Sequence, residues 1–416
     1  MGSDPSIPLP RIVHLQDYAA VLGEAEISLL RSLAARLGGR TVKMVNSTSV
    51  GGGVAEILNC MVPLLQDLEV PTRWDVITGG NDFFEITKAF HNALHGAPYE
   101  SRPADFELFL AVNEMNRARM DFSEDIIVIH DPQPVALVHQ REQEKRKKPW
   151  IWRCHIDLSN PSPAVWSFLE PWVSKFDATI FSSPNFSRKL SVPQNLFFPA
   201  IDPLSEKNRA LEPEYVASVL ERFQIDPRRP ILTQVSRFDR LKDPVGVIRA
   251  YKMVKKYMDC QLVLAGGGAR DDPEGGEVLA EVREVAGNDP DVHVLELPPW
   301  SALEINALQR ASTIVIQKSL REGFGLTVAE GLWKKVPVVA SAVGGIPSQI
   351  IHKQTGMLVH SIEGCAFQIR YLLSNPAVMQ RLGENGHEHV KANFLITSSI
   401  KSYLVLFILL LEQMKS

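Results

Sequence analysis

Short apolar runs alternate with segments of helical periodicity along almost the whole chain. The runs have the length of buried strands, and the segments between them repeat Leu, Ile, Val and Ala on one helix face. Strands are predicted at residues 41–46, 73–77, 125–129, 150–155, 178–182, 230–235, 261–265, 292–295, 311–316, 336–340 and 357–359. Helices are predicted at residues 16–37, 54–68, 83–94, 245–258, 326–335, 362–374 and 377–390. This alternation indicates βαβ units with parallel sheets, and therefore an α/β fold.

The alternation is interrupted once, between residues 203 and 225, and then starts again. A chain of 416 residues is too long for one ordinary core, so two domains are expected. We place an N-terminal domain at residues 1–210 and a C-terminal domain at residues 226–396. Residues 398–416 form an apolar helix that we expect to pack back on the first domain. The predicted architecture is two doubly wound, Rossmann-like domains that face each other across a cleft.

Glycines or polar side chains follow the predicted strands of the first domain. Gly51–Gly53 come between the first strand and its helix, where phosphate or sugar could approach the backbone. His130-Asp131 and His155 end two further strands. Because ligands of doubly wound sheets bind at the carboxyl edge of the strands, these residues are candidates for a site. A tight structural turn at the glycines and structural roles for the histidines are the alternatives.

The stretch from Ser319 to Gly331 combines a strand end, a glycine turn and a helix start. Glu322 stands at the mouth of the Gly323-Phe324-Gly325 turn, and Glu330 follows about one turn into the helix. A helix N-terminus beside a glycine turn makes an anion site, and both carboxylates can face one ligand. An ordinary surface carboxylate next to a strand–helix loop is the competing interpretation.

Two cations, Arg237 and Lys242, follow the first strand of the second domain. Together with the Gly323 turn they can neutralise a diphosphate, although a simple surface charge pair is the alternative. A charge-compensated diphosphate is a good leaving group, so the chemistry needs no metal, cofactor or strong base. Glu330 can accept hydrogen bonds from ribose hydroxyls. A nucleotide on the second domain and a sugar on the first fit this arrangement.

Composition narrows the functional classes. The formal net charge of −4 argues against nucleic acid as the main partner. Residues 1–10 are polar and proline-rich, unlike a signal peptide, and the apolar run at residues 403–411 is far shorter than the roughly 20 residues that span a bilayer. No membrane partner is therefore expected. The cysteines show no metal-binding spacing and indicate buried, reduced thiols of a cytoplasmic protein. They are Cys60, Cys154, Cys260 and Cys365.

Several motifs occur together at the strand ends. Those of the second domain are Arg237 with Lys242, Glu322 with Glu330 in an E-x7-E pattern, Gly344-Gly345-Ile346-Pro347, and Gly356-Met357-Leu358-Val359. Those of the first domain are residues 45–56, 90–94, 130–134, 152–157 and 201–205. The second domain resembles the retaining GT-B glycosyltransferases of the glycogen-synthase-like branch. The first domain resembles the trehalose glycosyltransferring synthases and their close relatives, the retaining trehalose phosphorylases.

This resemblance covers nearly the whole chain from about residue 12 and implies roles for several of these residues. It implies transfer of glucose from a nucleoside diphosphate glucose (UDP- or ADP-glucose) to free glucose, which gives trehalose reversibly. Retention without a well-placed nucleophile favours a front-face mechanism, and Glu322 as a covalent nucleophile is the competing interpretation. The implied catalytic residues are His155, Arg237, Lys242 and Glu322. The implied donor-binding residues are Gly52, Gly53, Arg237, Lys242, Glu322, Gly323, Phe324, Gly325, Leu326, Thr327 and Glu330. The implied acceptor-binding residues are Asn46, Asp131, Trp152 and Arg153.

Other functions remain open at this point. A retaining trehalose phosphorylase would use inorganic phosphate in place of the nucleotide and would not need Glu330 to meet a ribose. A sucrose-phosphate or glycogen synthase is a further transferase, but a phosphorylated acceptor requires extra cations near the first-domain cleft, where only Arg153 stands out. A non-catalytic nucleotide-sugar sensor and a GT-B epimerase use the same scaffold. The expected partners are the two sugar substrates, with a homodimer as one oligomeric state.

Overall fold

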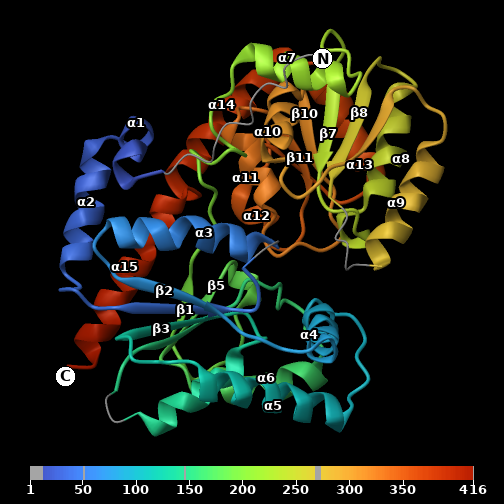
Figure 1. The fold of residues 1–416 in the computed structure, drawn as a ribbon. Helices are drawn as coiled ribbons and strands as arrows, with labels where there is room; N and C mark the ends of the chain where they lie inside the picture. The colour runs from blue at the N-terminus through green and yellow to red at the C-terminus, as the bar shows by residue number, and fades with distance from the viewer. Residues whose placement is uncertain (1–12, 50–51, 145–146, 268–272, 416) are drawn as a thin grey trace, which may run out of the picture.

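The computed structural model describes residues 13–49, 52–144, 147–267 and 273–415, which form two α/β lobes (Figure 1). Gly51 lies outside these ranges. So do residues 1–10, on which the expectation of no signal peptide rests. Each lobe is built on a parallel sheet of six strands, so the predicted pair of doubly wound domains is confirmed. We call them the first lobe, built on β1–β6, and the second lobe, built on β7–β12.

The first sheet has the strand order β2-β1-β3-β4-β5-β6, and every neighbouring pair is parallel. Its central strands are apolar and fully buried, as expected for a sheet covered on both faces. The order reverses between β1 and β3, so a crevice opens where these two strands end. The strands are β1 (Val42–Asn46), β2 (Thr72–Val76), β3 (Ile126–His130), β4 (Trp150–Arg153), β5 (Ala178–Phe181) and β6 (Gln194–Leu196).

Helices cover both faces of the first sheet. On one face lie α1 (Ala19–Leu22), α2 (Glu24–Ala35), α3 (Gly52–Asp67) and α15 (Ile396–Gln413). On the other lie α4 (Asn81–Leu94), α5 (Pro103–Arg119) and α6 (Pro163–Val173). Short 3-10 turns occur at η1 (Leu15–Tyr18), η2 (Val135–Gln143) and η3 (Pro184–Phe186). In Figure 1, α3 lies on the side of the first sheet that faces the second lobe.

The second sheet has the order β12-β11-β10-β7-β8-β9, again with parallel neighbours, and its order reverses between β10 and β7. The strands are β7 (Ile231–Val235), β8 (Gln261–Gly266), β9 (Val292–Glu296), β10 (Ile314–Gln317), β11 (Val338–Ser341) and β12 (Met357–Val359). One face is covered by α8 (Pro244–Lys255), α9 (Pro273–Ala286) and α13 (Ile362–Leu373). The other is covered by α7 (Pro213–Arg222), α10 (Ala302–Ala311), α11 (Leu326–Trp333) and α14 (Pro376–Asn393). Two short elements, η4 (Arg240–Lys242) and α12 (Ile346–Gln349), lie in loops.

The chain crosses between the lobes in two segments that lie side by side. Ile201 accepts and donates backbone hydrogen bonds of 2.9 Å with Ile396 and Phe394, next to a parallel bridge to Leu395. Beyond this point α15 runs along the first lobe and buries its apolar side against α2 and α3 (Figure 1). By length and composition alone α15 could cross a membrane, but 56% of it is buried inside the protein. Such burial is typical of a core helix.

Several boundaries differ from the sequence-based expectation. The helix predicted at residues 16–37 is broken at Gly23, whose φ of +87° ends α1. Ala311, predicted to start a strand, ends α10 instead. The predicted interruption near residues 203–225 contains α7, which packs in the core of the second lobe, so that lobe begins before the expected residue 226. Strand β6 and the helices α5, α6, α7, α9, α10 and α12 were not predicted.

Candidate functional site

Lys242 and Glu322 meet where the strand order of the second sheet reverses. Lys242 follows β7 and Glu322 follows β10, and these strands are neighbours in the sheet. The Lys242 Nζ atom lies 2.7 Å from Glu322 Oε2. Gln317 Nε2 and Ser319 Oγ donate to the same oxygen at 3.3 and 3.1 Å. The predicted candidates Lys242 and Glu322 therefore form a nearly buried ion pair at the usual ligand edge of such a sheet.

The turn after Glu322 is held in place by a second glycine pair. Gly325 has φ +83° and caps α11, so the first turn of that helix begins at Leu326 and Thr327. Gly344 and Gly345 press against the turn: a Cβ at Gly344 would lie 1.6 Å from the carbonyl oxygen of Glu322. Only glycine tolerates this approach, which explains the Gly344-Gly345 motif in packing terms.

Phe324 does not offer its ring to the site. Its side chain is buried and lies 5.7 Å, centroid to centroid, from Phe394 in the core beneath the turn. A ligand could therefore reach only the backbone of Phe324. The remaining turn residues, Gly323 and Gly325, likewise present backbone groups next to the positive end of α11.

Arg237 is the exposed member of the predicted cation pair. Its side chain is 62% exposed, and its nearest carboxylate contact is Asp239 at 3.6 Å. Its positive charge, with that of Lys242, is among the influences that lower the pKa of His91 on α4. Arg237 therefore lies where the second lobe approaches the first and has the freedom to contact a bound anion.

Glu330 is deeply buried, which its spacing from Glu322 did not reveal. Its carboxylate lies 3.4 Å from Lys207 Nζ and accepts a hydrogen bond of 3.1 Å from Gln309 Nε2. Burial alone would raise the pKa of Glu330, but the charges of Lys207 and Lys334 hold it below its ordinary value. The carboxylate is thus ionised and already has two partners.

Two histidines of the first lobe pair at the ends of β3 and β4. His130 Nδ1 and His155 Nε2 lie 3.1 Å apart, with the rings nearly parallel and 5.4 Å between centroids. Burial lowers the pKa of both, and the nearby Arg153 charge adds to this effect. Asp131 adopts a left-handed φ of +63° and accepts the His155 backbone N–H at 2.7 Å. The pair is therefore neutral and fixed relative to the backbone.

The two lobes meet at residues that the sequence had singled out. A Cβ at Gly323 would lie 2.8 Å from the carbonyl oxygen of His155, and a Cβ at Gly53 would lie 3.3 Å from Leu326 Cδ1. Gly52 and Gly53, expected in a glycine-rich loop, instead form the first turn of α3. The expectation of a loop was wrong there because glycine is also tolerated at a helix N-terminus.

The four candidate acceptor residues differ in what their side chains do. Asn46 is engaged on both sides, donating to Thr48 O at 2.7 Å and accepting from Trp74 Nε1 at 2.8 Å. Trp152 is a core residue whose Nε1 donates to Asp131 O at 2.9 Å. Both therefore support the β1 and β3 ends from beneath.

Arg153 and Asp131 form the charged part of this region. Arg153 is 2% exposed and donates from Nη2 to Ser182 Oγ at 3.1 Å, while its Nη1 has no partner among the described residues. Burial lowers the pKa of Arg153 and raises that of Asp131 to about 6. A buried guanidinium with an unused donor is a natural contact for a polar ligand.

Sequence reasoning assigned no site role to three groups that border the site. His91 on α4 and His95 directly after this helix have tilted rings with 4.7 Å between centroids, and their i, i+4 spacing was a signal that could have been used. Lys207 lies in an irregular segment, where periodicity carries no information. Arg321 stands next to Glu322 and contacts the first lobe, since a Cβ at Gly96 would lie 3.3 Å from its Nη2.

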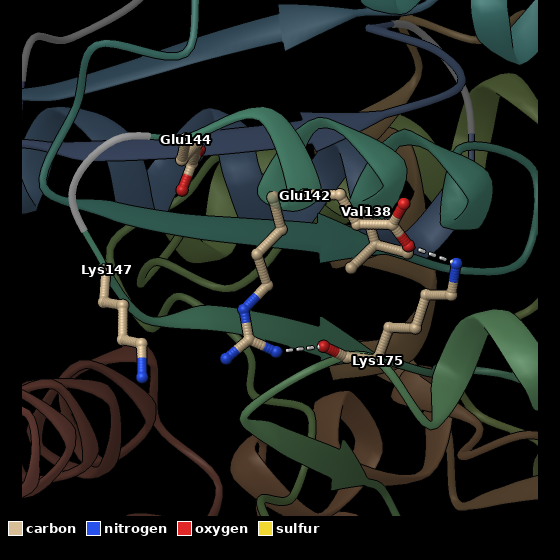
Figure 2. Close-up of a pocket in the computed structure, with 6 residues that line it drawn as sticks. Val138, Glu142, Glu144, Lys147 and Lys175 are labelled. Atoms are coloured by element: carbon tan, nitrogen blue, oxygen red, sulfur yellow. Dashed lines mark hydrogen bonds and ion pairs between the residues drawn. The ribbon is translucent and has the colours of Figure 1, made fainter.

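A surface hollow of about 370 Å³ lies at the other edge of the first sheet (Figure 2). Lys175 and Lys147 precede β5 and β4, so the hollow borders the amino ends of these strands, away from His155. Its charged groups are largely paired with one another: Lys175 Nζ lies 2.6 Å from Glu142, and Arg141 donates to the Lys175 carbonyl. The candidate site therefore stays where the two lobes meet, near Gly323 and His155.

Comparison with known proteins matches a family to each lobe and several relatives to most of the chain. The family described as "Trehalose synthase, N-terminal domain" matches residues 44–188, and "Glycosyl transferases group 1" matches residues 219–389. Trehalose synthase of Pyrococcus horikoshii is 45% identical over 399 residues, covering 94% of this chain and 95% of that protein. Trehalose phosphorylase of Pleurotus pulmonarius is 27% identical over 433 residues, covering 90% and 58%. The solved sucrose-phosphate synthase of Thermosynechococcus elongatus shares the fold, with a TM-score of 0.70, 19% identity and coverage of 90% and 100%.

Proposed function

Because the chain belongs to the trehalose synthase family of GT-B glycosyltransferases, we propose that it transfers glucose from a nucleoside diphosphate glucose to free glucose. The product would be trehalose, formed reversibly and with retention at the donor carbon. The observation that carries the proposal is the Lys242–Glu322 pair of 2.7 Å at the strand reversal of the second sheet. In this pair, a cation that can neutralise a diphosphate lies beside a carboxylate that can accept hydrogen bonds from sugar hydroxyls, and both are close to the turn that approaches His155.

Each part of the donor has a matching group in this proposal. Arg237 and Lys242 neutralise the diphosphate, which makes it a better leaving group. Glu322 and the backbone of residues 323–327 hold the hydroxyls of the donor glucose, and Glu330 holds the ribose. Gly52 and Gly53 approach the phosphates from the first lobe, where the N-terminus of α3 favours an anion.

The reaction proceeds on one face of the sugar. The bond between donor C1 and the diphosphate oxygen breaks, and the bond from the acceptor O1 to C1 forms on the same face. The acceptor proton passes to the leaving phosphate oxygen. The partial negative charge of the His155 carbonyl, which contacts Gly323, stabilises the positive charge that develops on the donor ring. No metal or prosthetic group enters this scheme.

Glu322 acts in this scheme by orienting the donor and forms no bond to it. Its Oε2 already accepts from three donors, Lys242, Gln317 and Ser319, which fix its position and lower its nucleophilicity. A slow donor analogue should therefore leave no glucosyl adduct on Glu322 in a peptide mass spectrum. An adduct at that residue would establish the covalent mechanism instead.

Product analysis tests the overall function. The protein should form trehalose from UDP- or ADP-glucose with glucose, and should give no sugar phosphate disaccharide with glucose 6-phosphate. A trehalose phosphorylase is the second candidate. It is favoured by the two protein partners of Glu330, Lys207 and Gln309, which satisfy the carboxylate without a ribose. Phosphate-dependent cleavage of trehalose without any nucleotide would decide for it.

The proposal also includes the cellular compartment and the binding partners. The four cysteines are free, three of them buried and Cys60 half-buried, as suits a reducing compartment such as the cytoplasm. The proposed binding partners are the sugar donor and the glucose acceptor. We further propose a homodimer, which sedimentation would test.

A further inference from the structure

We propose that Lys207 is a positioning residue that couples occupation of Glu330 to closure of the two lobes through Glu56 on α3. This inference rests on the proposed function, because it assigns the ribose of the donor to Glu330. It adds a residue in the segment between the lobes to the site, and it names the contact through which donor binding reaches the first lobe.

The segment that carries Lys207 is attached to the second lobe. Asn306 Nδ2 on α10 donates to the carbonyl oxygens of Glu206 and Arg209, both at 2.8 Å. Arg310 Nη2 donates to those of Asn208 and Arg209 at 2.9 Å. These bonds satisfy main-chain groups of an irregular segment in a buried setting. Residues 206–209 therefore move with the second lobe.

Lys207 connects two carboxylates that belong to different lobes. Its Nζ lies 2.9 and 3.0 Å from the two oxygens of Glu56 on α3, and 3.4 Å from Glu330 Oε1 on α11. Glu56 is half exposed, whereas Glu330 is almost fully buried. Since Lys207 moves with the second lobe, its contact with Glu56 exists only when the lobes are close together.

Lys207 is also the main counter-charge of Glu330. The other nearby cation, Lys334, directs its Nζ to Asn208 Oδ1 at 2.9 Å and to the Glu330 carbonyl at 3.3 Å. Burial lowers the pKa of Lys334 to about 7, so it is a weak source of positive charge near neutrality. Lys207 therefore divides its charge between Glu330 and Glu56.

Donor binding shifts this division. Ribose hydroxyls that donate to Glu330 satisfy part of its negative charge, so Lys207 is released toward Glu56. Glu56 lies one helical turn after Gly52 and Gly53, the residues proposed to approach the phosphates. A stronger Lys207–Glu56 contact therefore draws the N-terminus of α3 onto the donor, which links the ribose end of the site to its phosphate end.

The test compares three full-length variants with the unmodified protein. We measure the radius of gyration by small-angle X-ray scattering with and without UDP and ADP. We also measure the Kd of each nucleotide, kcat, and KM for the donor and for glucose. Lys207→Met should abolish the nucleotide-induced compaction and lower kcat/KM for the donor by about 10-fold or more, with KM for glucose unchanged. Glu56→Gln should also abolish compaction while changing the nucleotide Kd less than Lys207→Met does. Lys401→Met removes a 2.5 Å ion pair with Glu26 in the first lobe. It is the matched control and should change neither the nucleotide-induced compaction nor the donor kinetics.

Each result decides the question. Normal compaction and donor kinetics in both Lys207→Met and Glu56→Gln overturn the inference, and the half-exposed Glu56 keeps this test open if Lys207→Met misfolds. An unmodified protein that turns over no nucleotide donor with any acceptor refutes the proposed function instead. If the unmodified protein turns over the donor and the variants keep its compaction and donor kinetics, the coupling alone is refuted.

Discussion

Gly323 and His155 touch across the two lobes: a Cβ on Gly323 would lie only 2.8 Å from the His155 carbonyl oxygen. The two residues belong to different lobes, and each lies in the loop that follows a strand, Gly323 after β10 and His155 after β4. This close approach fixes the distance between the Glu322 turn and the His130–His155 pair. It also leaves no room for a side chain at residue 323.

Gly323→Ala is therefore expected to impair activity more than stability. The new methyl group must push the Glu322 turn away from His155, and displacement of reacting groups by about 1 Å can lower the rate about 100-fold. Steady-state kinetics with a nucleotide donor and a thermal melt would measure both effects. Gly276→Ala on α9 is the control, since a Cβ there meets nothing within 4 Å. Equal activity of the two variants would contradict the prediction.

Lys242→Met should lower kcat/KM for the donor by about 100-fold or more, because it removes a preorganised cation from the leaving group. The variant also leaves Glu322 with Gln317 and Ser319 alone, so some loss of stability accompanies the effect. Lys255→Met provides the control, as Lys255 pairs with Asp259 and Asp291 at the surface of the same lobe. Retention of kcat/KM within about threefold in Lys242→Met would remove Lys242 from the mechanism.

Arg237→Ala should weaken nucleotide binding while leaving the melting temperature nearly unchanged. The side chain is 62% exposed and has only a long contact to Asp239, so its removal costs about 0.5 kcal/mol or less in folding. Titration calorimetry with UDP and ADP would report the loss of affinity, expected to be about 10-fold for one charged contact. Arg228→Ala, at a site that is 87% exposed, serves for comparison. An unchanged Kd would show that Arg237 does not meet the anion.

The stability of the protein should fall as the pH decreases below about 6.5. Burial, followed by nearby positive charges, lowers the pKa of His91 to about 3 and of His95 to about 4. The unfolded chain, with ordinary histidine pKa values near 6.5, takes up protons first, so acid favours unfolding. The charged groups that act on the pair are Arg237, Asp239, Lys242 and Arg321.

Urea unfolding between pH 7 and pH 4 would measure this effect. His91→Gln should flatten the dependence, because it removes one of the groups that titrate only in the unfolded state over this range. His360→Gln, at an exposed position, should leave the curve as it is in the unmodified protein. If the stability of the unmodified protein does not change between pH 7 and pH 4, His91 and His95 are not held neutral in the folded protein.

Truncation of the side chains of α15 should destabilise the first lobe. Phe407 is fully buried in the core cluster that includes β1, α2 and α3, and its replacement by Ala should cost about 3–5 kcal/mol. Leu409, two residues later and 51% exposed, should cost far less when replaced by Ala. Ending the chain before residue 396 should lower the melting temperature strongly. An unchanged melting temperature after that truncation would show that α15 is dispensable for the first lobe.

Most of the fold could be predicted because parallel strands that are buried on both faces are continuous apolar runs. Most of the strands from β1 to β12 were found this way. Strands β2 and β9 were also predicted although they are partly exposed and only partly apolar, and the short and exposed β6 was missed. Strand order has no comparable local signal. That Lys242 and Glu322 form an ion pair depends on the adjacency of β7 and β10, which are separated by a long stretch of chain.

The site could be predicted where its residues stand at strand ends, and could not where burial decides their role. Spacing placed Glu330 beside Glu322 but gave no indication that a Lys207 from an irregular segment would reach it. Likewise Phe324, Asn46 and Trp152 belong to site motifs, yet their side chains are taken up by packing or by internal hydrogen bonds. Exposure depends on tertiary neighbours, and a single sequence does not record them.

The position of α15 also sets a timetable for synthesis. The core of the first lobe includes Leu404 and Phe407, which the ribosome adds only after the whole second lobe has been made. At about 5–20 residues per second, the interval between Leu196 and Ile396 lasts on the order of tens of seconds. During that time α2 and α3 have an uncovered apolar face. The second lobe, although it comes later in the chain, can thus complete its core first, and the nascent first lobe is the part that would need protection from aggregation.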